Sequence, residues 1–136
     1  MAKMLVVDDD PAWRALYRMG FETDFEVYEA VDGLDALAAL DRVRPDVIVL
    51  DLKMPHLDGM GFLRQMERRG LKLPVVVCSG MFTMDSPPAI PGVFPATKSP
   101  DLRNVWGALE AALPRPLEGD SSLKSRRAID ATVWRD

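Results

Sequence analysis

The residues of this chain most able to do chemistry are polar side chains that directly follow apolar runs. Asp8 and Asp9 follow the apolar run of residues 4–7, Asp51 follows that of residues 47–50, and Ser79 follows that of residues 75–78. Short, continuous apolar runs are typical of strands buried on both faces of a parallel sheet, and ligands bind outside the carboxyl ends of such strands. We therefore expect these side chains to meet at one edge of a sheet, together with the ammonium group of Lys98. Such a set of carboxylates, hydroxyl and ammonium suits a divalent metal ion and a phosphoryl group.

The composition indicates one folded domain. The chain has 136 residues, of which 48% are hydrophobic, and this fraction is enough for a buried core. Its net charge of −4 argues against direct binding of nucleic acid, because polyanions attract basic surfaces. No apolar run is long enough to cross a bilayer, no signal peptide is visible, and Cys78 is the only cysteine. We therefore expect no membrane insertion and a cytoplasmic location.

Strand and helix patterns alternate along the chain, which predicts an α/β architecture. Asp10 and Pro11 favour the start of a first helix, with Asp10 as its cap and an end near Gly20. Helical spacing predicts that the face of this helix toward the sheet is formed by Ala12, Ala15, Leu16 and Met19. Further helices are expected after Asp32 and Gly33, after Asp58 and Gly59, and from about Pro100 onward.

Two weaker strand patterns complete the expected sheet. The pattern of residues 25–29 predicts a short edge strand. Residues 94–97 are predicted to form another strand, and Pro95 is tolerable there if the strand lies at an edge of the sheet. Prolines crowd the segment of residues 80–95, where we expect a loop with at most a turn or two of helix. Two more prolines follow the last helix, so we expect one domain over residues 1–114 and a polar, mobile tail over residues 115–136.

Several stretches of the chain resemble the receiver domain of bacterial two-component response regulators. The similar stretches are residues 5–11, residues 45–59, residues 77–80, and Lys98. The most specific is the motif Asp-x-x-Met-Pro-x-x-Asp-Gly that begins at Asp51, and the resemblance spans residues 2 to 113. It implies a CheY-like, stand-alone receiver with a doubly wound, flavodoxin-like fold. Its five-stranded parallel sheet would have the order 2-1-3-4-5, and its fourth helix would be short, irregular or missing.

The resemblance also implies a magnesium site and a nucleophile. Asp51 would attack a phosphohistidine of a sensor histidine kinase or phosphotransfer protein and become an aspartyl phosphate. Mg²⁺ would be held directly by Asp9, by Asp51 and by the main-chain carbonyl of Lys53, with Asp8 assisting through a bound water. The chain would therefore be a signalling domain rather than an enzyme, catalysing only its own phosphorylation and dephosphorylation.

Two further residues take their roles from the same resemblance. Ser79 would donate a hydrogen bond to a phosphoryl oxygen, while Lys98 would pair with Asp51 before phosphorylation and with the phosphoryl group afterwards. Phosphorylation would then switch a surface that binds an unidentified downstream protein. The chain departs from the family where Ser99 separates Lys98 from Pro100. It also departs where the family has a conformationally switching aromatic residue, because Pro95 occupies that position and Phe94 lies one residue earlier. Either the strand is shifted by one residue or the aromatic switch is absent.

Plainer interpretations exist for each residue taken singly. Two aspartates after a strand commonly cap a helix, and a lone serine or lysine is usually a solvated loop residue. A receiver-like interaction module that works without phosphorylation is the main alternative. A phosphatase of the haloacid-dehalogenase type is disfavoured because Lys53 stands where that family has its second aspartate. A flavin carrier is disfavoured because no phosphate-binding loop rich in Ser, Thr and Gly follows the first strand. His56 is given no catalytic role.

Overall fold

Five strands and four helices alternate along the parts of the chain that the computed structural model describes, which are residues 1–79 and 92–113. The elements are β1 (Ala2–Val7), α1 (Pro11–Phe21), β2 (Phe25–Ala30), α2 (Gly33–Val43), β3 (Val47–Asp51), α3 (Gly59–Arg68), β4 (Val75–Ser79), β5 (Val93–Thr97) and α4 (Arg103–Ala112). All neighbouring strands are parallel, in the order β2-β1-β3-β4-β5. The predicted doubly wound sheet is therefore confirmed. The predictions for residues 80–91 and for the C-terminal tail lie outside the described residues.

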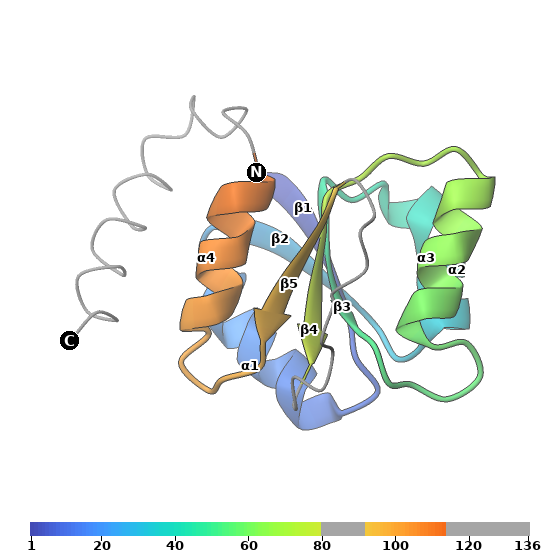
Figure 1. The fold of residues 1–136 in the computed structure, drawn as a ribbon. Helices are drawn as coiled ribbons and strands as arrows, with labels where there is room; N and C mark the ends of the chain where they lie inside the picture. Colours follow the sequence, from blue (N-terminus) through green and yellow to red (C-terminus); the bar gives the residue numbers. More distant parts are fainter. Residues whose placement is uncertain (80–91, 114–136) are drawn as a thin grey trace.

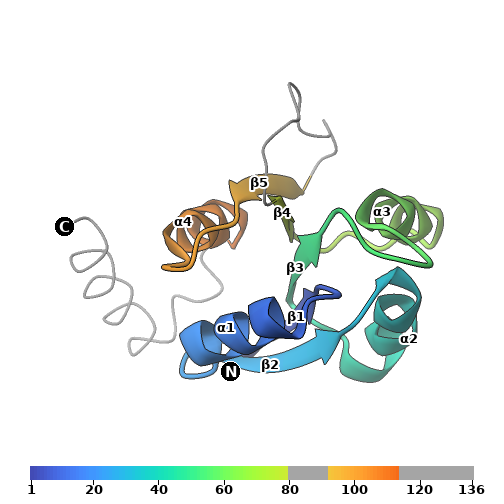
Figure 2. The ribbon, with the colours of Figure 1, turned by 90° about the horizontal axis from the view of Figure 1, so that it is seen from below.

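Helices cover both faces of the sheet, α1 and α4 on one side and α2 and α3 on the other (Figures 1 and 2). Each face has its own apolar core, one centred on Phe21 and Trp106 and the other on Leu50 and Phe62. The central strand β3 is buried along its whole length, which explains why its sequence is a continuous apolar run. No helix in the described ranges is both long and apolar enough to cross a bilayer.

Aspartates cap the first three helices. Asp10, Asp32 and Asp58 each accept a hydrogen bond from a main-chain N–H in the first turn of α1, α2 and α3. Such caps satisfy N–H groups that have no partner inside the helix, and each is worth about 1 kcal/mol. The predicted cap at Asp10 is confirmed, and Asp58 serves the structural turn that its position before Gly59 indicates.

The predicted buried face of the first helix is correct only at Leu16, which is half-buried and packs against the core. Ala12, Ala15 and Met19 are exposed, and the helix buries Tyr17 and Phe21 instead. Burying large aromatic rings removes more apolar area from water than burying alanines does, so the rotation of α1 follows the aromatic residues.

The predicted end of the first helix near Gly20 is confirmed, because α1 ends at Phe21. Gly20 itself lies inside the helix, where a Cβ atom would clash with the side chain of Leu102, so this glycine allows close packing. The predicted start of the last helix differs from the structure. Helix α4 begins at Arg103, not near Pro100, because Leu102 adopts a left-handed conformation with φ of 58° and forms the N-cap. The preceding residues form a separate turn in which the Leu102 N–H donates to the Ser99 carbonyl.

The weak strand over residues 94–97 is confirmed as part of β5, the outermost strand next to β4. Pro95 lies in the middle of this strand and is exposed. Proline cannot donate to a ladder and is found in sheets mainly at edges, so its presence agrees with the edge position. The register pairs Ser79 of β4 with Thr97 of β5, which brings the carboxyl ends of these strands together.

Candidate functional site

Three aspartates gather where the two central strands end. Val7 of β1 lies opposite Leu50 of β3, so Asp8 and Asp51 follow at neighbouring positions on the same edge of the sheet. One carboxylate oxygen from each of Asp8, Asp9 and Asp51 lies within 4.8 Å of the others. Asp8 is 1% exposed and Asp51 is 8% exposed, while Asp9 faces solvent. The predicted convergence of these carboxylates is therefore present in the structure.

Lys98 reaches this cluster from the residue after β5. Its Nζ lies 2.7 Å from Asp8 Oδ2 and 3.6 Å from Asp51 Oδ1, and its side chain is only 9% exposed. The closer ion pair is thus with Asp8, whereas the family resemblance implied a pair with Asp51. Because β4 separates β5 from β3 in the sheet, the long lysine side chain must extend across the end of β4 to make these contacts.

The electrostatics of the cluster follow from burial of like charges. Burial, followed by the charge of Asp8, raises the pKa of Asp51 from 3.8 to about 6, although Lys98 and a main-chain N–H of Lys53 oppose the shift. Burial acts to lower the pKa of Lys98, but its hydrogen bond to Asp8 and the charges of Asp51 and Asp8 outweigh burial and raise that pKa. Lys98 therefore stays cationic, and Asp51 is a carboxylate at neutral pH whose charge is only partly compensated.

The two remaining predicted residues lie beside the cluster. Ser79 is the last residue of β4, the strand between the one that ends in Asp51 and the one that precedes Lys98. Lys53 lies in the loop after β3, and its main-chain N–H donates a hydrogen bond to the Asp51 carboxylate. Both residues therefore occupy the edge at which their proposed roles would be exercised.

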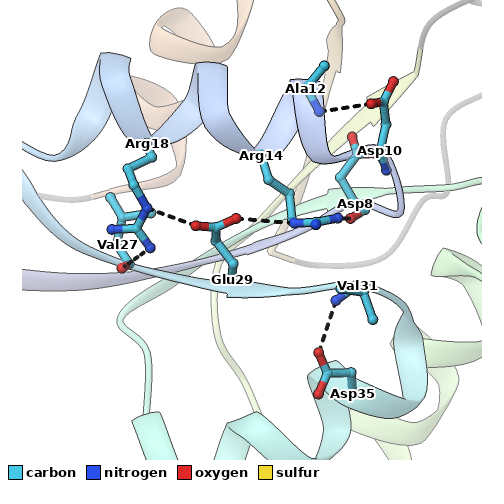
Figure 3. Close-up of polar contacts among 9 residues, drawn as sticks. All are labelled: Asp8, Asp10, Ala12, Arg14, Arg18, Val27, Glu29, Val31 and Asp35. Atoms are coloured by element: carbon cyan, nitrogen blue, oxygen red, sulfur yellow. Dashed lines mark hydrogen bonds and ion pairs between the residues drawn. The ribbon is translucent and has the colours of Figure 1, made fainter.

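An arginine of α1 fixes the main chain at the acidic pair, and sequence reasoning missed it (Figure 3). Arg14 Nη1 donates to the carbonyl oxygen of Asp8 at 2.7 Å, while its Nε contacts Glu29 of β2 at 3.1 Å. Arg18 contacts the other oxygen of Glu29 at 2.8 Å and donates to the Val27 carbonyl. Two arginines four residues apart on a helix, facing a glutamate of an adjacent strand, were the available signal.

A tryptophan of α1 contacts the lysine and was also missed. The ring of Trp13 lies 4.9 Å from Lys98 Nζ, within the range of a cation–π interaction. Trp13 belongs to the first turn of the helix that directly follows the acidic run, and this position was its only sequence signal. The ammonium group of Lys98 thus has an aromatic contact in addition to its carboxylate partners.

The loop that follows Asp51 is tied to helix α2. His56 Nδ1 lies 2.8 Å from Asp32 Oδ2, and the Gly33 N–H donates to the Leu57 carbonyl at 3.0 Å. His56 adopts a left-handed conformation with φ of 67°. The pKa of Asp32 is lowered, first by the main-chain N–H of Asp35 and then by His56. The contact of His56 with Asp32 therefore ties this loop to the start of α2.

The donor set fits a hard divalent cation. The clustered side chains that could ligate a metal offer only carboxylate oxygens, which Mg²⁺ prefers over nitrogen or sulfur. Burial and, after it, the charge of Asp8 raise the pKa of Asp51, and a cation at the cluster would favour the ionised form of this carboxylate. Chemically, the site offers an ionised carboxylate as a nucleophile and an ammonium group beside it.

The chain is similar in sequence to known signalling proteins. Residues 4–87 match the family model described as the response regulator receiver domain. The chemotaxis protein CheY of Listeria monocytogenes is 39% identical over 83 residues, which cover 60% of this chain and 70% of that protein. A protein-glutamate methylesterase/protein-glutamine glutaminase of Anaeromyxobacter dehalogenans is 44% identical over 80 residues, but these cover only 23% of its length and 58% of this chain.

The chain is also similar in fold to solved structures. Chemotaxis protein CheY4 of Vibrio cholerae superposes with a TM-score of 0.70 and 26% identity, over 83% of this chain and 99% of that one. The response regulator TrrA of Thermotoga maritima, solved in complex with Mg²⁺ and BeF, superposes with a TM-score of 0.74 over 83% of this chain and all of its own. At 22% identity, this second likeness supports the fold alone.

Proposed function

The chain belongs to the response regulator receiver domain family, and on that premise we propose that it accepts a phosphoryl group on Asp51 and thereby switches a protein-binding surface. The observation that carries this proposal is the buried carboxylate of Asp51, which lies beside two further aspartates and 3.6 Å from the ammonium group of Lys98. Phosphoryl transfer asks mainly for positioning and for neutralisation of charge. The arrangement supplies the positioning, and Lys98 together with a bound Mg²⁺ would supply the neutralisation.

The proposed reaction is a substitution at phosphorus. An oxygen of the Asp51 carboxylate forms a bond to phosphorus as the bond to the donor breaks, and the donor leaves as a neutral imidazole or, from acetyl phosphate, as acetate. Lys98 moves its pairing from carboxylate to phosphoryl oxygen, and Ser79 donates a hydrogen bond to another phosphoryl oxygen. Asp8, Asp9, Asp51 and the carbonyl of Lys53 would hold Mg²⁺, whose bound charge would offset that of the phosphoryl oxygens.

We propose a sensor histidine kinase or a phosphotransfer protein as the donor and a second protein as the target of the switched surface. A cytoplasmic location follows from such partners. The receiver unit is proposed to span residues 1–114, because the described sheet and its covering helices extend from residue 2 to residue 112. A separate segment over residues 115–136 remains a prediction from the sequence.

Incubation of the full chain with acetyl phosphate and Mg²⁺ tests the proposal directly. Wild type should gain the mass of one phosphoryl group, whereas Asp51→Asn should gain none, and omission of Mg²⁺ or addition of EDTA should abolish the gain. Asp41→Asn, on the exposed side of α2, is the matched control and should label like wild type. Absence of labelling in wild type would instead favour an interaction module that works without phosphorylation.

A further inference from the structure

We propose that Trp13 is a positioning residue that holds the ammonium group of Lys98 at the carboxylate cluster, an inference that rests on the proposed phosphorylation of Asp51. The ring centroid of Trp13 lies 4.9 Å from Lys98 Nζ. A cation at this distance is attracted by the electron-rich face of the indole. Trp13 comes from α1, whereas Lys98 follows β5, so the contact joins two distant parts of the chain.

The contact lies in a largely dry environment. The side chain of Lys98 is 9% exposed, so few water molecules compete for its ammonium group, and cation–π attraction is stronger where the cation is desolvated. Trp13 itself is half-buried and packs against Tyr17, with ring centroids 6.0 Å apart. Tyr17 is 1% exposed, so the indole rests on a residue fixed in the core.

The proposed chemistry makes this contact useful. Lys98 has a long, flexible stem and must extend across the end of β4, so holding its ammonium group in one place costs conformational entropy. Its ion pairs with Asp8 and Asp51 depend on the charge of those carboxylates, which changes when a cation binds or when Asp51 becomes an acyl phosphate. The indole is neutral throughout, so its attraction for Lys98 persists through each of these states.

Rates of Asp51 phosphorylation by acetyl phosphate with saturating Mg²⁺ test the inference in the full chain. Trp13→Leu keeps an apolar side chain without a ring face and should slow the reaction about fivefold to tenfold, whereas Trp13→Phe should lose less than about threefold. In a Lys98→Met background, Trp13→Leu should have almost no further effect, because the interaction is already gone. Equal, additive losses with and without Lys98 would overturn the inference.

A packing control separates positioning from stability. Leu16 lies on the same helix, is half-buried and packs against the same core, but contacts neither Lys98 nor the carboxylates in any described interaction. Leu16→Ala should lower the melting temperature and leave the rate near that of wild type. If Leu16→Ala slows the reaction as much as Trp13→Leu, the effect is one of packing and the inference is wrong.

The outcomes also separate this inference from the proposed function. If wild type gains no phosphoryl group, the proposed function fails, and the role of Trp13 fails with it. If wild type is phosphorylated and Trp13→Leu reacts at the same rate, only the role of Trp13 is overturned.

Discussion

Replacing Asp51 with asparagine is expected to stabilise the metal-free protein, even though it removes the proposed nucleophile. Folding places this carboxylate in a buried site beside Asp8, which raises its pKa from 3.8 to about 6. A carboxyl group whose pKa rises on folding binds its proton more tightly in the folded state than in the unfolded state. Its effect on the free energy of unfolding is therefore small near and below the unfolded pKa and becomes fully unfavourable above the folded pKa.

The size of the effect follows from those two pKa values. The penalty for ionising Asp51 in the folded state is about 0.6 kcal/mol near pH 4, about 1.6 kcal/mol near pH 5, and about 3 kcal/mol above pH 7. Asp51→Asn abolishes the ionisation and so removes this pH-dependent contribution to the free energy of unfolding. Lys98 keeps its closer partner Asp8 at 2.7 Å, so the substitution does not leave the ammonium group unpaired.

Urea denaturation in EDTA, followed by circular dichroism at several pH values, measures this difference. The free energy of unfolding of Asp51→Asn minus that of wild type should grow by roughly 2 kcal/mol between about pH 4 and pH 7.5. Asp41→Asn removes one exposed negative charge and serves as the control. A difference that stays constant with pH, or shrinks as pH rises, would refute the assignment of Asp51 as a destabilised, buried carboxylate.

Four further outcomes are expected from the structure. Lys98→Met leaves the buried Asp8 without its cation and should lower the free energy of unfolding by about 3–5 kcal/mol in urea denaturation, with most of this recovered by adding Asp8→Asn. Mg²⁺ at about one hundred times its Kd should stabilise wild type by about 2.7 kcal/mol in thermal unfolding, and a gain of equal size in Asp51→Asn would contradict the proposed metal site. Gly59→Ala would place a Cβ atom 2.5 Å from the Asp51 carbonyl oxygen and should cost about 1–3 kcal/mol in urea denaturation while weakening Mg²⁺ binding measured by calorimetry. Gly107→Ala meets no atom within 4 Å inside helix α4, so it should instead gain about 0.5–1 kcal/mol.

The sheet and the acidic cluster could be predicted because they depend on the main chain. Buried parallel strands have a distinctive sequence pattern, and whatever follows such strands must emerge at one edge. Asp8 and Asp9 directly follow β1, and Asp51 is the last residue of β3. The parallel pairing of these two strands is therefore enough to bring the three carboxylates together. Pro95 could likewise be assigned to an edge strand because proline lacks the N–H that a central strand requires.

The contacts around the cluster could not be predicted because they depend on helix rotation and side-chain reach. The spacing predicted Leu16 correctly but placed the exposed residues Ala12, Ala15 and Met19 on the buried face of α1. The rotation of the helix is set instead by burial of Tyr17 and Phe21. With that rotation, Trp13 meets Lys98 and Arg14 meets the Asp8 carbonyl. Lys98 Nζ lies 2.7 Å from Asp8 and 3.6 Å from Asp51. No sequence pattern can predict which of these two carboxylates is the closer partner.

Pro95 also bears on how the protein behaves at high concentration. Among the described residues no strand pairs with the outer side of β5, so a row of main-chain groups is left there that another polypeptide could use to extend the sheet. A residue without an N–H in the middle of this five-residue strand interrupts that row, so an added strand would form only a broken ladder. Intermolecular β-stacking, the first step toward amyloid-like aggregates, is therefore disfavoured along this edge.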